Sequence, residues 1–373
     1  MSKVANGYEI IQLFESYSPQ RFAVEGDKIG LQIGTLNKPI HNVMITLDLL
    51  EEVANEAIEK KVDLIIAHHP PIFRPLKNIV TDKPAGKIIE KCLKNDIAVY
   101  AAHTNLDVAD GGVNDLLAEA LGLTDTEVLA PTFTEPLKKL VVFVPKEKEN
   151  VVREAIGNAG AGHIGNYSHC TFKSNGTGTF LPLEESIPYI GNKGSMEFVE
   201  EVRLETIFPA FLQKKIIKAM EKAHPYEEVA YDIYPLDNKG EEKGLGRIGN
   251  LPEEMTLQQF AEMIKKSLQV EGVRMVGSPH SIVKKAAVLG GDGNKYIHTA
   301  KFKGADVFVT GDLYFHVAHD AMMMGLNVID PGHHVEKVMM QGVTNVLLSM
   351  CNEKEYEVSI FPSEVDTNPF KFI

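Results

Sequence analysis

The stretch HNVMITLDLLEEVANEAIEKKVDLIIAHHPP (41–71) decides the fold. Residues 41–48 and 62–69 are continuous apolar runs of the kind found in buried strands, and residues 49–61 between them repeat apolar positions at helical spacing. The two prolines at 70–71 end the second run. Apolar strands that alternate with helices indicate an α/β fold in which helices cover both faces of a parallel sheet.

The same alternation continues toward both ends of the chain. The first third adds helices at 7–17, 85–96 and 113–122 and a strand at 97–103. The last third repeats the pattern, with strands at 286–291, 305–311, 326–332 and 356–362 separated by helices. Since neither stretch alone has the usual number of strands, we expect two similar α/β halves that share one sheet system.

The middle of the chain follows a different pattern, β-α-β-β-α-β, which is typical of a ferredoxin-like fold. Its third element is predicted to be a hairpin, because residues 169–182 contain the turn signal SNGTG (174–178). The polar, glycine-rich stretch 237–250 reads as a return linker. We therefore place an α/β domain at 1–129 plus 245–373 and an inserted ferredoxin-like domain, with its return linker, at 130–244.

Composition and charge exclude several classes of protein. The formal net charge of −13 argues against a nucleic-acid partner, although a metal ion could still attract a phosphorylated small molecule. Three dispersed cysteines without a CxxC pair argue against a disulfide framework and a thiolate zinc site. No signal sequence and no run of roughly 20 apolar residues are present, so we expect a cytoplasmic protein with no membrane contact.

Histidines and carboxylates gather where predicted strands end, which is where ligands bind in open α/β sheets. Several strand ends of this kind converging in one place would be a stronger signal than any one of them. These residues are His68 and His69, His103 and Asp107, Asp312 and His316, and finally Asp330, His333, His334 and Glu336.

Strand geometry limits how these residues could bind metal. Successive side chains of a regular strand point to opposite faces, so either the strand breaks at the prolines or His68 and His69 serve two ions. His333 and Glu336 are three residues apart at a helix start and can face the same side, so Glu336 could bridge two ions, with Asp107 as an end ligand. The alternative is that the histidine pair only caps its strand and packs under the following loop.

Mixed imidazole and carboxylate ligands favour two divalent ions, zinc first, with manganese, iron or nickel as alternatives. His103 and Asp312 are candidates for proton relay or for orienting the ligands, or they make ordinary hydrogen bonds at strand ends. Two further motifs carry less weight. VLGGDGN (288–294) is interpreted as a tight turn rather than a phosphate contact, and HPYEEVAYD (224–232) as a helix-to-strand junction.

Five motifs together resemble one family, the GTP cyclohydrolase 1 type 2 homologues, also called Ngg-interacting-factor-three-like proteins. They are EGDKIGLQIG (25–34), IIAHHPPIF (65–73), AAHTNLDVADGGVND (101–115), VTGDLYFH (309–316) and DPGHHVEK (330–337). The middle segment, especially HPYEEVAYDIYPL (224–236), looks like the P-II/CutA-like domain of the longer bacterial members.

The resemblance implies a dinuclear metal site, and the family's ligands fall on His68, His69, Asp107, His333 and Glu336. Many relatives separate the last two ligands by four residues, whereas three separate them here. The resemblance also implies ring-shaped homohexamers, built as a dimer of trimers, with the sites facing an internal cavity.

The residues and the resemblance together favour a metal-dependent hydrolase of a small polar molecule. Ring-opening hydrolysis of GTP is the reaction that the family name implies. Two other functions remain open at this point: a two-metal phosphoesterase, and a non-enzymatic metal-binding regulatory or scaffold protein.

Overall fold

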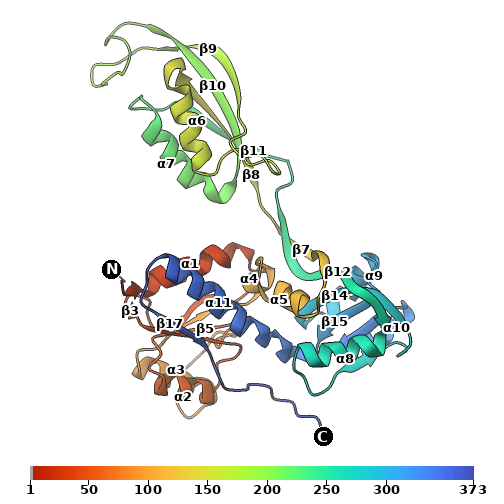
Figure 1. Cartoon of the computed structure of the whole chain (residues 1–373). Helices are drawn as coiled ribbons and strands as arrows, with labels where there is room; N and C mark the ends of the chain where they lie inside the picture. The colour runs from red at the N-terminus through yellow and green to blue at the C-terminus, as the bar shows by residue number, and fades with distance from the viewer. Residues whose placement is uncertain (1–2) are drawn as a thin grey trace. The chain divides into compact units, whose positions relative to one another are not determined.

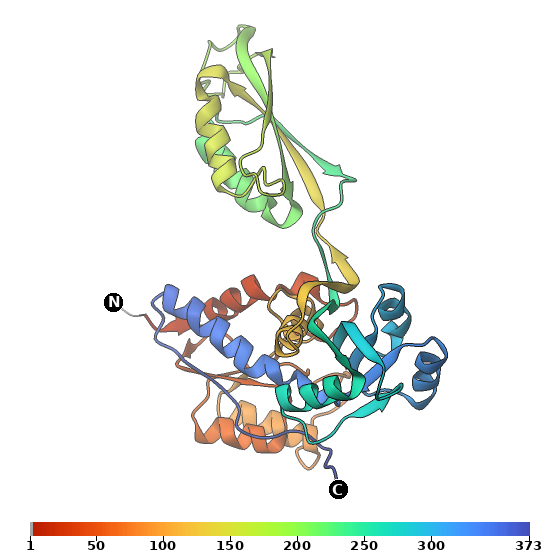
Figure 2. The same ribbon diagram turned by 45° about the vertical axis from the view of Figure 1, so that its right-hand side comes forward.

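The computed structural model describes residues 3–373, which form two compact units (Figures 1 and 2). Of these, residues 3–133 and 243–373 belong to the α/β unit, and Thr134–Glu242 form the inserted unit. Among the described residues, no helix is long and apolar enough to cross a membrane. The expected α/β class with an inserted second fold is confirmed.

The first sheet of the α/β unit has five strands, and its central strands are buried on both faces. Four neighbours run parallel and β2 is antiparallel to β6. The strand order is β17 (Ser359–Pro362), β4 (Asn42–Thr46), β5 (Leu64–Ala67), β6 (Ala98–Ala101) and β2 (Gly30–Ile33).

The second sheet has six strands and contains the three parallel neighbours β14, β15 and β16. Its order is β13 (Arg274–Val276), β16 (Asn327–Asp330), β15 (Val307–Gly311), β14 (Ile282–Asp292), β12 (Glu242–Thr256) and β7 (Thr124–Thr134). The expectation of one shared sheet was wrong. Two sheets form instead, and each includes a strand from the other α/β stretch. β17, from the last third of the chain, joins the first sheet, and β7, from the first third, joins the second.

A layer of helices lies between the two sheets. The apolar side chains of these helices form one core cluster with side chains from strands of both sheets. These helices are α1 (Gly7–Tyr17), α5 (Val113–Ala120), α8 (Leu257–Ser267) and α11 (Val338–Glu353). On the outer face of the first sheet lie α2 (Glu51–Glu59) and α3 (Pro84–Lys94), side by side in Figure 2. On the outer face of the second lie α9 (Ile297–Phe302) and α10 (Phe315–Met323). A two-stranded sheet pairs β1 (Ala5–Asn6) with β3 (Pro39–Ile40).

The inserted unit is a four-stranded antiparallel sheet with two helices packed on one face. The strand order is β11 (Tyr231–Leu236), β8 (Leu137–Pro145), β10 (Glu197–Pro209) and β9 (Phe172–Phe180), and the helices are α6 (Glu149–Asn158) and α7 (Gln213–Ala223). This order and the β-α-β-β-α-β sequence of elements are those of a ferredoxin-like fold.

Two glycine-rich stretches were misread from the sequence, both for the same physical reason. SNGTG is not a turn but the interior of β9, where a side chain at Gly178 would collide with the Glu201 carboxylate. Most of the expected linker 237–250 belongs to β12, where a side chain at Gly244 would collide with the Ala130 carbonyl. The glycines allow close approach between neighbouring strands rather than a change of chain direction.

Candidate metal centre

The candidate metal centre lies where the carboxyl ends of the parallel strands of the two sheets meet. The first sheet supplies His68 and His69 directly after β5, His103 after β6, and Asp107 from the short helix α4 (Thr104–Val108). The second sheet supplies His333 and Glu336 from the 3₁₀ helix η5 (His333–Lys337), which follows β16. Six of the seven residues predicted for the site therefore gather in one cluster, and the seventh, Asp312, contacts it from outside.

Glu336 lies at the centre of this cluster, with only 3% of its surface exposed. Its Oε2 atom is 3.1 Å from Nε2 of His69 and 3.1 Å from Nε2 of His333. The same oxygen is 3.8 Å from Nε2 of His68. A 3₁₀ helix has three residues per turn, so the spacing of three places His333 and Glu336 one above the other. The shorter spacing in this chain is therefore compatible with a shared site.

The potential ligand atoms form three groups, and within each group all of the atoms lie within 4.8 Å of one another. Two of them share the central carboxylate: one joins His68, Asp107 and Glu336, and the other joins His69, His333 and Glu336. The third joins His68, His69 and His103. The two groups that share Glu336 contain one each of the neighbouring histidines, as expected if His68 and His69 contribute to different ions.

Each of the four imidazoles contacts an oxygen acceptor through its Nδ1 atom. Because these acceptors are carbonyl or carboxylate oxygens, Nδ1 holds a proton, and Nε2 is the ring atom that is left to bind a metal ion. The contacts are His68 to the Ala102 carbonyl (2.8 Å), His69 to Asp48 (2.7 Å), His103 to Asp27 (2.8 Å) and His333 to Asp312 (2.7 Å).

Burial and charge perturb the ionisation of the whole cluster. Burial lowers the pKa of His68 to about 3, so this imidazole is neutral at pH 7. Burial also opposes protonation of His69, but hydrogen bonds to two carboxylates raise its pKa to about 10. The Glu336 contact raises the pKa of His333 to about 9. Burial and the Glu336 charge raise the pKa of Asp107. The centre attracts positive charge, which a divalent cation supplies.

Two buried polar atoms test whether the residues fit a metal ion. Among the described residues, Nε2 of His68 and Oδ1 of Asp107 have no hydrogen-bond partner. The two atoms are 3.6 Å apart and the His68 side chain is fully buried. Leaving buried polar atoms unsatisfied is unfavourable, and a cation between them removes the penalty. The donor set fits a divalent metal ion.

The sequence prediction missed two carboxylates that accept from imidazoles of the cluster: Asp48 accepts from His69, and Asp27 accepts from His103. Asp48 follows β4 directly, so the strand-end signal used for the other residues also marks it. The hydroxyl of Thr367, from the C-terminal segment, donates to its other oxygen at 2.7 Å. Asp27 lies in the EGDKIGLQIG motif and also accepts from the backbone N–H of Thr104 at 3.0 Å.

Three strand-end residues are not brought into the cluster. Asp330 pairs with Arg274 and accepts from the backbone N–H of Leu313 at 3.0 Å. His334 approaches the Thr367 hydroxyl at 3.3 Å, and His316 packs beside the Phe315 ring on α10. These side chains have structural partners of their own.

The glycines of VLGGDGN provide the space that the centre needs. A Cβ atom at Gly291, where φ is +64°, would lie 2.8 Å from Oε1 of Glu336 and 3.2 Å from Nε2 of His333. The Glu336 carboxylate therefore packs directly against the backbone of this motif. A cavity of about 890 Å³ adjoins the centre, lined by His69, Asp312, His333 and residues 366–372, and has the size of a small-molecule site.

Comparison with known proteins shows which family the chain belongs to. A model of Duf34/NIF3 (NGG1p interacting factor 3) matches residues 5–369. The chain belongs to the Duf34/NIF3 family. The family resemblance inferred from the five motifs is thereby confirmed.

Several Duf34/NIF3 relatives match along their full length. A Bacillus subtilis protein named "GTP cyclohydrolase 1 type 2 homolog" is 70% identical over 373 residues, covering all of both chains. A protein of the same name from Halalkalibacterium halodurans is 59% identical, again covering both chains fully. The crystal structure of a Bacillus cereus protein related to NIF3 is similar over the full length of both chains, with a TM-score of 0.95 and 66% identity.

Proposed function

We propose that this Duf34/NIF3 protein is a metal-dependent hydrolase of a small polar molecule and holds two divalent ions per chain. The observation that carries the proposal is the pair of ligand groups that share Glu336, with each participating imidazole anchored through Nδ1. One ion would be held by His68, Asp107 and Glu336, and the other by His69, His333 and Glu336. Zinc is the first choice for this donor set, with manganese, iron or nickel as alternatives.

A bound pair of such ions supplies Lewis acidity and lowers the pKa of water. The protein's own groups orient the site and move protons. Asp48 and Asp312 fix the rings of His69 and His333. His103 is the proton-transfer group of this proposal, since Asp27 accepts from its Nδ1 and holds its ring beside His68 and His69.

The name shared by the curated relatives supports GTP as the first substrate to test. Hydrolysis would add water at the carbon between the two nitrogens of the imidazole ring of guanine. The bond from that carbon to one ring nitrogen would break, and His103 would deliver a proton to that nitrogen. A second hydrolysis would release the carbon as formate.

Turnover by the full-length, metal-loaded protein tests the proposal. The protein is incubated with GTP and other nucleotides, and formate and phosphate are measured separately. Formate release that is lost in His103→Gln and kept in His316→Gln, which lies outside the cluster, is the expected result. Phosphate without formate would favour a phosphoesterase. No product from protein carrying two ions per chain would favour a non-enzymatic metal-binding role.

Metal stoichiometry tests the dinuclear part of the proposal. Zinc titration of chelator-treated protein, followed by elemental analysis, should saturate at two ions per chain. His68→Ala and Asp107→Ala should each lower affinity about 10-fold or more, because each leaves one ligand group incomplete. Saturation at a single ion would defeat the bridging role of Glu336.

A further inference from the structure

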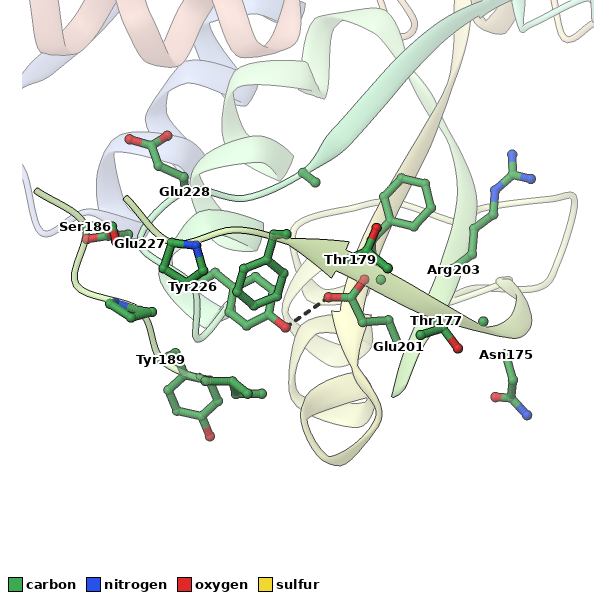
Figure 3. Close-up of a pocket in the computed structure, with 18 of the residues that line it drawn as sticks. Asn175, Thr177, Thr179, Ser186, Tyr189, Glu201, Arg203, Tyr226, Glu227 and Glu228 are labelled. Atoms are coloured by element: carbon green, nitrogen blue, oxygen red, sulfur yellow. Dashed lines mark hydrogen bonds between the residues drawn. The ribbon is translucent and has the colours of Figure 1, made fainter. Parts of the chain in front are cut away.

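The inserted unit contains a cavity of about 550 Å³ that is separate from the metal centre (Figure 3). It lies on the face of the sheet that α6 and α7 leave uncovered, beneath the loop 181–196 that follows β9. The backbone N–H of Ile187 donates to Oε1 of Glu227 at 2.8 Å and ties this loop to the segment after α7. The volume is that of a site for a small molecule.

A buried carboxylate faces this cavity. Glu201, on β10, is only 9% exposed, and the Tyr226 hydroxyl donates to its Oε1 at 2.9 Å (Figure 3). Among the described residues, no cationic side chain pairs with Glu201. The nearby Arg203 instead pairs with Glu205 at 3.2 Å, and Figure 3 shows it pointing away from Glu201. A buried carboxylate without a cationic partner is unfavourable unless a ligand supplies the cation.

Aromatic rings line the same cavity. The Tyr226 ring centroid is 5.9 Å from that of Phe180 and 6.2 Å from that of Tyr189. Burial and the Glu201 charge raise the pKa of Tyr226, so its hydroxyl keeps its proton and continues to donate. Aromatic faces attract cations through their quadrupole and bury flat apolar groups.

The backbone of β9 is shaped to make this room. A side chain at Gly178 would collide with the Glu201 carboxylate, and Gly176, also on the cavity wall, carries no side chain to fill the space. Glu227 and Glu228 add further acidic groups to the lining, against one basic side chain, Arg203. The cavity therefore combines an excess of negative charge with flat apolar walls.

We propose that this pocket binds a small organic cation, an ammonium or amidinium group on a flat apolar body, whose N–H groups donate to Glu201. The apolar body would lie among Phe180, Tyr189 and Tyr226. An anion would meet three carboxylates, and a neutral molecule would leave the charge of Glu201 unpaired. The inserted unit would thus be a ligand-binding domain in its own right, independent of the hydrolase proposal.

Calorimetric titration of the full-length protein tests this inference with two cationic probes, benzamidine and phenylethylamine. Benzamide, which is flat and neutral, is the matched control ligand. Both cations should bind wild type at least about 10-fold more tightly than benzamide, because a hydrogen bond between two charged groups is stronger than one from a neutral amide. Glu201→Gln should remove that preference.

The control variant is Glu200→Gln, the same change one residue away on β10, at a side chain that is 81% exposed and outside the cavity lining. It should bind both cations like wild type. Tyr226→Phe keeps the ring and removes the hydrogen bond that Glu201 accepts, so the preference for both cations over benzamide should rise. An unchanged or reduced preference in Tyr226→Phe would also contradict the role of Glu201, which covers the case in which Glu201→Gln does not fold. Equal binding of benzamide and benzamidine, equal effects at Glu200 and Glu201, or no binding of either cation would each overturn the inference.

Discussion

His69 shows how a single side chain can be fixed from both ends. Asp48 accepts from its Nδ1 at 2.7 Å, and Nε2 lies 3.1 Å from Oε2 of Glu336. Asp48 is itself held by Thr367, six residues before the last residue, Ile373. The orientation of His69 thus depends on Asp48 and Thr367, which are far apart in the sequence and would not themselves touch the metal.

Removing this support should weaken metal binding without removing any ligand. Asp48→Ala is expected to lower zinc affinity about 10- to 100-fold, as is typical when the hydrogen-bond partner of a ligating histidine is lost. Asp320→Ala, at an exposed position on α10, serves as the control. Unchanged affinity in Asp48→Ala, measured by zinc titration, would show that the Asp48 contact does not orient His69.

At the scale of elements, two glycines have a positive φ: Gly291 near the end of β14 and Gly304 just after α9. Their surroundings differ. Gly291 has φ +64° and lies against Glu336, whereas Gly304 has φ +81° and has no atom within 4 Å of the Cβ position. The first position has a steric constraint set by the metal centre, and the second has only the backbone constraint of a helix end.

Alanine substitutions at Gly291 and Gly304 can therefore be compared as a matched pair. Gly291→Ala and Gly304→Ala should each lower the free energy of unfolding by about 1–2 kcal/mol, the cost of a left-handed conformation in a non-glycine residue. Only Gly291→Ala should also lower zinc affinity, because its Cβ would displace Glu336. Denaturant unfolding and zinc titration measure the two effects separately, and a similar loss of zinc affinity in Gly304→Ala would contradict the explanation.

The sequence predicted buried strands and amphipathic helices well because their apolar periodicity is local. The seven predicted site residues were chosen because strand ends in an α/β fold are a known location for ligands, and the structure brings six of them into one cluster. The two-sheet arrangement was missed because β17 and β7 pair with strands far away in the sequence. SNGTG was misread because the contact that requires Gly178 comes from Glu201, on another strand. Local patterns do not contain such partners.

At the scale of the whole molecule, the chain leaves and re-enters the α/β unit on neighbouring strands, β7 and β12. Deleting residues 134–242 and joining the two strands by a short turn should therefore leave a fragment that folds and binds zinc like the full chain. Size-exclusion chromatography and zinc titration test this. An aggregated fragment, together with an unfolded isolated insert, would show that the two units depend on each other.

We propose that the protein assembles as a homohexamer built from two stacked trimers, as the family resemblance implies. Exposed apolar side chains on the inserted unit support an interface there, among them Phe172 (71% exposed), Ile187 (79%) and Phe198 (72%). Light scattering should give a mass near six times the 41.2 kDa of one chain. A mass of 41.2 kDa at micromolar concentration, unchanged by zinc, would contradict the proposal.

The pairing of β17 with β4 has a consequence for synthesis on the ribosome. These strands are adjacent in the first sheet, yet more than three hundred residues separate them along the chain. At about 5–20 residues per second, the partner of β4 emerges roughly 15 seconds to one minute later. During that interval one edge of a very apolar strand has no neighbour, and such an edge is a template for association with other nascent chains. We therefore expect the growing chain to be bound by chaperones that hold extended apolar segments until translation ends.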